Sequence, residues 1–171
     1  FFTPKKVSLQ PHKKFSVNSK KAEVLFTSYI LDHLKPTGRA GIIVPEGIIY
    51  QTGKAYIELR KQLIENALIG VVSLPMGVFE PYADVKTSIL FLDKKLNKTS
   101  DSIFFAQVDN DGFSLNKRRI KIPDNDLPNI SKSISSYLSS NKTTNNLKLL
   151  TKKEILDRTY KDLKRPNIEL K

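Results

Sequence analysis

Apolar residues in the first half of the chain follow helical spacing in two segments. In residues 22–34 and again in residues 54–67 they recur every three to four positions, so each segment is predicted to form a helix that buries one face. Ser19 precedes the first segment as a candidate N-cap, and Pro36 follows it as a stop. The predicted buried stripes consist of Leu25, Phe26, Tyr29, Ile30 and Leu34 in the first helix and of Tyr56, Leu59, Leu63, Ile64 and Ala67 in the second. The side chains predicted to face water in the second helix are Lys54, Glu58, Arg60, Lys61 and Glu65.

Three short apolar runs, which lie between or after these helices, predict strands. They are found at residues 40–44, 69–74 and 87–93. The first two runs enclose the second helix within ~35 residues, the length of a strand-helix-strand unit with a right-handed crossover, so we expect them to be parallel neighbours. A loop of about a dozen residues without helical spacing precedes the third run, which we expect to return in the reverse direction. The predicted fold class is α/β.

The second half of the chain predicts a smaller extension of this sheet. Residues 103–108 form a strand-like run, and the turn sequence DNDG leads from it into a predicted hairpin with residues 113–122. Asp126 is the candidate cap of a short helix, and Thr151 with Glu154 forms a capping box for a last amphipathic helix. The predicted organisation is a basic extended arm at residues 1–18, an α/β unit at 19–96, a strand-hairpin and short-helix extension at 97–138, a polar linker at 139–150 and an amphipathic helix at 151–171.

Composition fits a globular protein and excludes several kinds of site. A chain of 171 residues, 39% of them hydrophobic, is long enough and apolar enough to bury a core. The absence of cysteine excludes disulfides, thiolate metal sites and cysteine nucleophiles, and it fits a reducing compartment. No zinc spacing or calcium loop occurs, so no metal is expected. Because the sequence has no signal peptide and no apolar run of about 18 residues, we expect a cytoplasmic protein without a membrane partner.

Basic residues outnumber acidic ones by 29 to 17, and the resulting net charge of +12 favours a polyanionic partner such as DNA. The alternative is a solvated basic surface that has no such partner. Two dense clusters are candidates for phosphate contacts, although solubilising arms have the same composition. They comprise Lys5, Lys6, Lys13, Lys14, Lys20 and Lys21 near the start of the chain, and Lys117, Arg118, Arg119 and Lys121 further on.

Three blocks of sequence carry a resemblance to a known family. They are LKPTGRAGIIVPEGIIY at residues 34–50, ELRKQLIE at residues 58–65 and SLPMGVFEPYADVKTSILF at residues 73–91. In this order they resemble the second half of the catalytic domain of N6-adenine DNA methyltransferases, particularly the modification subunits of type I restriction-modification systems. The resemblance covers roughly residues 20–130. It implies part of a Rossmann-like methyltransferase sheet, with two parallel strands, a reversed strand and flanking helices, followed by a C-terminal β-hairpin and helix extension.

The resemblance also implies an activity for the intact subunit, which is methyl transfer from S-adenosylmethionine to N6 of adenine. Such enzymes hold this cofactor with a glycine-rich turn and the adenine with an Asn/Asp-Pro-Pro-aromatic segment. None of the seven glycines here forms such a cluster, and the sequence has no Pro-Pro pair. We therefore expect a fragment that is inactive by itself, with both elements lying before Phe1. The implied partners are DNA and the specificity and restriction subunits of a type I system.

Four residues are candidates for the pocket that receives the adenine. By resemblance, Phe79 supplies a ring that stacks on the flipped base, with Tyr82 behind it. The alternative is that Val78 and Phe79 plug the core beneath the loop. Pro45 and Glu46 follow the carboxyl end of a predicted strand, where open α/β sheets place their ligands, although by residue type Glu46 is more typical of a solvated turn acid.

The residues expected to contact DNA include Lys86 and Thr87, which match a Val-Lys-Thr signature of the family. Lys86 would reach a phosphate or, alternatively, bind carbonyl groups of its own loop. The other DNA-contact candidates are Lys5, Lys6, Lys13, Lys14, Arg118 and Arg119. Two further hypotheses stay open at this point: a non-catalytic module that binds DNA or a specificity subunit, and a different α/β enzyme. The second of these lacks support from any Ser-His-Asp order, zinc spacing or phosphate loop.

Overall fold

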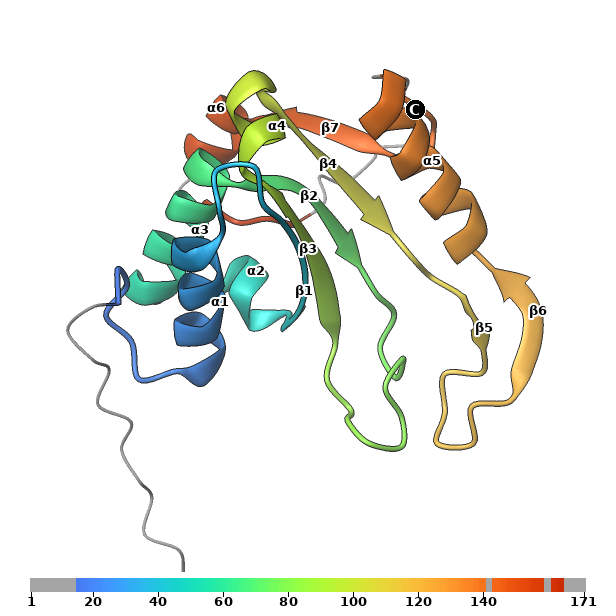
Figure 1. Ribbon diagram of the computed structural model, residues 1–171. Helices are drawn as coiled ribbons and strands as arrows, with labels where there is room; N and C mark the ends of the chain where they lie inside the picture. Colours follow the sequence, from blue (N-terminus) through green and yellow to red (C-terminus); the bar gives the residue numbers. More distant parts are fainter. Residues whose placement is uncertain (1–14, 141–142, 159–160, 165–171) are drawn as a thin grey trace, which may run out of the picture.

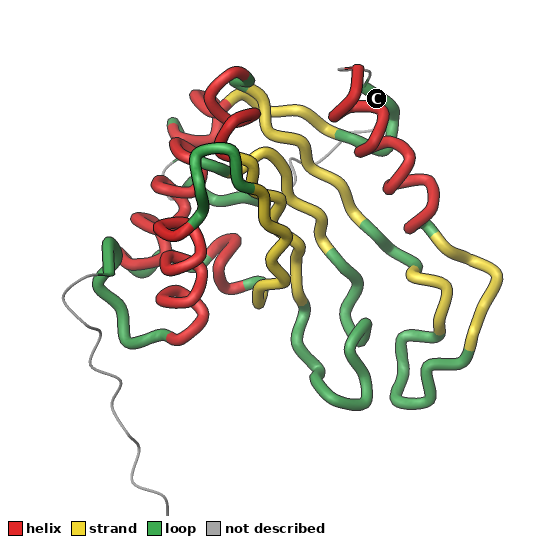
Figure 2. The backbone as a smooth tube through the Cα atoms, viewed as in Figure 1, coloured by secondary structure: helices red, strands yellow, loops and turns green. Residues whose placement is uncertain are grey.

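A mixed five-stranded sheet with helices on both faces forms the centre of the molecule (Figures 1 and 2), as seen in a computed structural model that describes residues 15–140, 143–158 and 161–164. The strands of this sheet are β1 (Arg39–Pro45), β2 (Leu68–Ser73), β3 (Thr87–Asp93), β4 (Ser102–Gln107) and β7 (Lys148–Thr151), and a separate hairpin contains β5 (Asp111–Phe113) and β6 (Lys121–Asn125). The helices are α1 (Ala22–His33), α2 (Gly47–Tyr50), α3 (Lys54–Asn66), α4 (Lys94–Thr99), α5 (Leu127–Ser140) and α6 (Lys152–Leu156).

The strand order is β1-β3-β2-β4-β7, with β3 between β1 and β2 and antiparallel to both. The predicted α/β sheet, with two strands in one direction and a reversed strand beside them, is confirmed. The expectation that the first two strands are neighbours was wrong. The reason is that β3 pairs with β1 along its whole length, from Arg39 opposite Asp93 to Pro45 opposite Thr87, and thereby occupies the place between them.

Each face of the sheet packs on its own hydrophobic cluster. The first face meets α1, α2, α3 and α6 through residues that include Val44, Ile48, Leu59, Leu63, Val71, Leu90, Phe105 and Ile155. The second face meets α5 through Ile69, Phe104, Ile130, Ile134 and Tyr137, among others. The ring of Phe104, a member of this second cluster, lies where a side chain at Gly70 would stand, 2.0 Å from an added Cβ, and 5.8 Å from the ring of Tyr137. Only glycine fits at that position of β2.

The predicted stripe of α1 is partly wrong. Phe26 and Tyr29 are exposed, and the buried side of the helix includes Thr27 and Ser28 instead. These two hydroxyls are satisfied locally, because Thr27 donates to the carbonyl of Glu23 at 2.7 Å and Ser28 pairs with Ser16 at 2.9 Å. The N-cap is Lys21, and the Ser19 hydroxyl instead accepts a hydrogen bond from the Lys21 amide.

The C-terminal extension is built differently from the prediction. β4 lies in the main sheet, parallel to β2 and antiparallel to β7, and the hairpin forms between β5 and β6 alone. The predicted linker at residues 139–150 therefore contains most of strand β7. The capping box of Thr151 and Glu154 is confirmed, but α6 ends at Leu156. Leu163, predicted as part of that last helix, is buried in a non-helical segment whose amide bonds the carbonyl of Ile49.

Candidate functional site

The carboxyl ends of β1, β2 and β4 meet at one edge of the sheet, which we call the rim. Strand β3 begins at the same rim because it runs in the opposite direction. A cavity of about 290 Å³ opens there. Its polar lining comes from the ends of β2, β3 and β4, from the adjoining loops and from the C-terminal segment. It consists of Glu46, Ser73, Lys86, Ser88, Gln107 and Lys164.

Glu46 and Lys86, which are far apart in the sequence, are brought together at this cavity. The Glu46 amide donates to the Lys86 carbonyl at 2.9 Å, so the turn after β1 is fastened to the end of the β2–β3 loop. The Lys86 ammonium lies 3.3 Å from Glu46 Oε2. This distance is within ion-pair range, yet Oε2 makes no directed hydrogen bond among the described residues, so the contact is electrostatic only. The two predicted candidates thus line the same cavity.

Two hydroxyl groups beside this ion pair are buried and have no hydrogen-bond partner in the described part of the chain. They belong to Thr87 and Ser88, which are 8% and 1% exposed. Buried polar atoms in folded proteins nearly always have a partner, and an unpaired one costs about 1 to 3 kcal/mol. The Ser88 hydroxyl, which belongs to a residue lining the cavity, therefore has unused hydrogen-bonding capacity.

One wall of the cavity is held in place by Arg60, which the sequence pattern placed on the water-facing side of α3. The side chain is fully buried and donates to three backbone carbonyls: Lys161 at 3.0 Å, Ile48 at 3.0 Å and Gln51 at 2.7 Å. Burial lowers the pKa of Arg60 to about 10, and the nearby charge of Asp162 opposes this shift. Arg60 thereby ties α2 to the C-terminal segment.

A signal for Arg60 was present in the sequence. Arg60 lies four residues after Tyr56 and four before Ile64, both of them members of the predicted buried stripe, so it shares the inward face of the helix. The prediction placed Arg60 in water because arginine is mostly exposed in proteins, although its helical position indicated the buried face.

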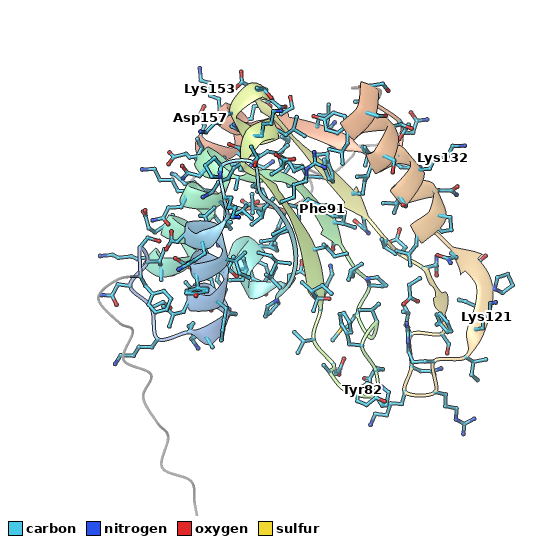
Figure 3. The ribbon with its side chains drawn as sticks, in the orientation of Figure 1. Tyr82, Phe91, Lys121, Lys132, Lys153 and Asp157 are labelled. Atoms are coloured by element: carbon cyan, nitrogen blue, oxygen red, sulfur yellow. The ribbon has the colours of Figure 1, made fainter. Side chains whose placement is uncertain are left out.

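Phe79 and Tyr82 lie on the β2–β3 loop, outside the rim cavity. Phe79 is half-buried and packs against the cluster on the second face of the sheet together with Val78. Tyr82 is 94% exposed near the end of the loop (Figure 3). Pro45 is exposed at the end of β1, opposite Thr87. The structure therefore separates the predicted base-pocket residues into a rim group with Glu46 and a loop group with Phe79.

The basic candidates also divide. Lys5, Lys6, Lys13 and Lys14 lie outside the described residues. Arg118 is exposed near the tip of the β5–β6 hairpin. Arg119 instead pairs with the buried Asp111 and lies over the ring of Phe113, 5.3 Å from its centroid, so it is engaged inside the hairpin. Arg118 is the arginine of this pair whose side chain is presented to solvent.

The described residues hold no group of three or more histidine, aspartate or glutamate side chains that could bind a metal ion. Nor does any helix in residues 15–140, 143–158 and 161–164 have the length and apolar character needed to cross a membrane. The glycines do not form a cofactor cradle, since Gly70 is filled by Phe104 and Gly77 is packed against the backbone of Leu115. Gly41, the glycine with open space beside it, stands alone in β1.

Comparison with known proteins decides the family. The model of the N-6 DNA methylase family matches residues 1–167, nearly the whole chain. The chain belongs to the N-6 DNA methylase family. The resemblance drawn from the three sequence blocks is thereby confirmed.

Curated relatives of this N-6 DNA methylase chain are methylase subunits of type I restriction enzymes. The EcoEI methylase subunit of Escherichia coli is 39% identical over 71 residues, which are 41% of this chain and 14% of the relative. The EcoKI methylase subunit of Escherichia coli strain K12 is 35% identical over 74 residues, or 42% of this chain and 13% of the relative. The matched segments thus span only about one seventh of these proteins.

Solved structures of larger type I proteins share the fold. A chain from a structure that addresses complex assembly and conformational transition of the type I restriction-modification system superposes with a TM-score of 0.71 at 28% identity, covering 90% of this chain and 33% of that one. The type I methyltransferase subunit of Streptococcus thermophilus gives a TM-score of 0.65 at 26% identity, covering 86% of this chain and 31% of that one. The N-6 DNA methylase chain therefore corresponds to about one third of each.

Proposed function

We propose that this chain forms the C-terminal part of the catalytic domain of a type I modification subunit, which transfers a methyl group from S-adenosylmethionine to N6 of adenine in DNA. The observation that carries the proposal is the family match across residues 1–167. The curated type I methylase subunits and the TM-score of 0.71 support the same assignment. In this proposal the specificity and restriction subunits of a type I system are partners, and the 171 residues alone are inactive.

The free side of β1 supports a larger catalytic domain. Among the described strands, β1 pairs with β3 and with no other, so its second edge is open. Ile43 is 55% exposed on this strand. A groove of about 730 Å³, lined by Gly41, Phe91 and Leu138 among others, separates the uncovered face of β1 and β3 from α5. An open edge with apolar neighbours is a liability unless another segment covers it, and we assign that cover to the preceding part of the same subunit.

The described residues do not fit S-adenosylmethionine. Two of their glycines are packed against Phe104 and Leu115 rather than around a space. We therefore place the cofactor on the preceding part of the subunit, and this chain supplies the side of the site that faces the DNA.

Phe79 is our candidate for the ring that meets the extruded adenine. Its half-buried position on a loop beside the rim leaves part of the ring accessible while packing fixes the rest. Stacking of an aromatic ring on a base is worth about 1 to 3 kcal/mol. At the rim, Lys86, whose side chain is 45% exposed, is a candidate for a polar contact with the same stretch of DNA.

The test is a methyl-transfer assay with the full-length protein that contains this sequence, together with its specificity subunit, duplex DNA and labelled S-adenosylmethionine. We expect label in DNA as N6-methyladenine, and none with residues 1–171 alone. DNA binding without any methyl transfer by the full-length assembly would contradict the proposal. That result would instead favour the alternative of a non-catalytic module that binds DNA or the specificity subunit.

A further inference from the structure

Two elements project side by side from the rim of the sheet. They are the β2–β3 loop (residues 74–86) and the β5–β6 hairpin (residues 111–125), which we call the paired fingers (Figures 1 and 2). They touch near their middle, because a Cβ added at Gly77 would lie 3.0 Å from the carbonyl oxygen of Leu115. Gly77 has a φ of 82°, a conformation that favours glycine, so both the contact and the backbone require this residue.

The surface of the paired fingers combines cations with exposed apolar side chains. Tyr82 is 94% exposed, Met76 57% and Ile120 58%. Residues 114–121 contain four cations and no acid. Of these cations, the exposed ones are Lys117, Arg118 and Lys121. The acids of the two fingers lie elsewhere: Glu80 and Asp84 on the loop, and Asp111, Asp124 and the hairpin's base at Asp126.

The tip of the hairpin is ordered by its own hydrogen bonds. Arg119 is only 18% exposed and pairs with Asp111, which is 5% exposed. The Asn116 side chain accepts from the Arg118 amide at 3.0 Å, and the Ser114 hydroxyl accepts from the Ile120 amide at 2.9 Å. Arg119 thus stabilises the shape of the tip, and the neighbouring cations point outward from a backbone that these hydrogen bonds hold in place.

The base of the hairpin is also fixed. The carboxylate of Asp126, predicted to cap α5, instead accepts hydrogen bonds from the amides of Asp109 at 2.9 Å and Asn110 at 2.8 Å. A two-stranded ribbon alone is only marginally stable. Anchored by Asp126 and braced by Asp111, this ribbon can hold its cations in a defined spacing.

We propose that the paired fingers bind duplex DNA beside the target base, with Lys117, Arg118 and Lys121 on backbone phosphates and the ring of Tyr82 against the groove. This inference rests on the proposed function and names the surface that meets the substrate. A two-stranded ribbon has the width that the major groove of B-DNA admits. Phosphate contacts from lysine and arginine fix the register of a protein on the duplex.

Arg119 has a different part in this proposal from the one its sequence suggested. It does not contact DNA but holds the tip in shape through Asp111 and the Ser114 carbonyl, 3.3 Å from its guanidinium. It is a positioning residue.

The test measures the salt dependence of DNA affinity for the full-length protein assembled with its specificity subunit. The slope of log affinity against log salt concentration is negative, and each phosphate contact adds about 0.9 to its magnitude. The variant Lys117→Gln/Arg118→Gln/Lys121→Gln should therefore reduce this magnitude by about 2.7. The control is Lys98→Gln/Lys132→Gln/Lys153→Gln, which removes the same charge from exposed positions on α4, α5 and α6; Lys132 and Lys153 are labelled away from the fingertips in Figure 3. An unchanged slope in the finger variant, or an equal fall in both variants, would contradict the inference.

Single variants keep the inference testable if the triple variant does not fold. Arg118→Gln should lower the slope by about 0.9, and Arg118→Lys should restore it, because the contact requires charge. If Arg118→Gln instead weakens binding of the specificity subunit while the DNA slope stays the same, the fingers are a protein interface and the inference is wrong. A wild-type assembly that binds DNA with the expected slope but never methylates it would contradict the proposed function and leave the DNA surface standing.

Discussion

Two side chains of α3 show how a single residue can be polar in chemistry and structural in role. Arg60 is enclosed and bonds three backbone carbonyls around the rim, although arginine in an amphipathic helix is ordinarily placed in water. Tyr56 is also buried, and its hydroxyl donates to Glu23 Oε1 at 2.7 Å, which joins α3 to α1. Both residues bury a polar head that is fully engaged. The hydrogen bonds of these two α3 side chains thus help to hold the elements next to the rim in place.

Tyr56 gives the protein a defined sensitivity to alkaline pH. Burial, reinforced by the bond to Glu23, raises the pKa of Tyr56 from 10.0 to about 12. A raised folded-state pKa contributes stability that is fully present below pH ~10 and is lost as pH rises toward 12, because the unfolded chain releases the proton first. Arg60, whose pKa is lowered to about 10, acts in the opposite direction over the same range.

The prediction compares Tyr56→Phe with the wild type, so that the effect of Arg60 cancels. Between pH 9 and 12 the free energy of unfolding should fall less steeply in Tyr56→Phe than in the wild type, when measured by denaturant unfolding on the full-length protein. Tyr82→Phe is the matched control, because Tyr82 is exposed and should follow the wild type. Parallel curves for Tyr56→Phe and the wild type would show that this hydroxyl is not held neutral by folding.

At the scale of elements, sequence motifs correctly predicted those features whose contacts lie within a few residues of one another. The capping box was predicted from Thr151 and Glu154 because both of its hydrogen bonds lie within one helical turn. The partner of β4 was not predictable in this way, because β4 pairs with β2, some thirty residues earlier, and with β7, more than forty residues later. An apolar run indicates a strand but does not specify its neighbour.

The hairpin offers a prediction at this scale. Asp111→Ala removes the buried partner of Arg119 and should raise the free energy of the β5–β6 hairpin by about 3 kcal/mol relative to its opened form. Hydrogen exchange of amides in residues 113–120 should then accelerate, while exchange in α3 stays the same. The control is Asp124→Ala, which removes an exposed acid from the same hairpin. Similar exchange in the two variants would mean that Asp111 does not brace the tip.

In the proposed function, one edge of the sheet is the working surface of the whole molecule. The general rule that ligands lie at the carboxyl ends of parallel strands was enough to select Glu46, and the family signature selected Lys86; the structure brings the two within 3.3 Å. The C-terminal segment that closes the cavity with Leu163 and Lys164 was not predictable, because it was assigned to a helix on the strength of spacing alone. Its place is set by contacts with α2 and Arg60 that no local pattern encodes.

Phe79 and Tyr82 mark the other part of this surface. The sequence suggested that they act together in one pocket, yet one ring packs against the sheet and the other stands in solvent on the same loop. The two roles proposed here follow from that difference. Phe79 is fixed enough to form a stacking wall, and Tyr82 is exposed enough to meet DNA from outside.

The most direct measurement is methyl transfer by Phe79→Ala in the full-length protein with its specificity subunit, alongside the affinity for S-adenosylmethionine. The account predicts a loss of methylation of roughly 5- to 150-fold, since stacking is worth about 1 to 3 kcal/mol, with cofactor affinity unchanged. Two packing controls separate stacking from stability: Val78→Ala in the same loop, and Leu63→Ala in the core, which should cost about 2 to 5 kcal/mol of stability. Unchanged methylation by Phe79→Ala, or a loss matched by Val78→Ala, would contradict the account.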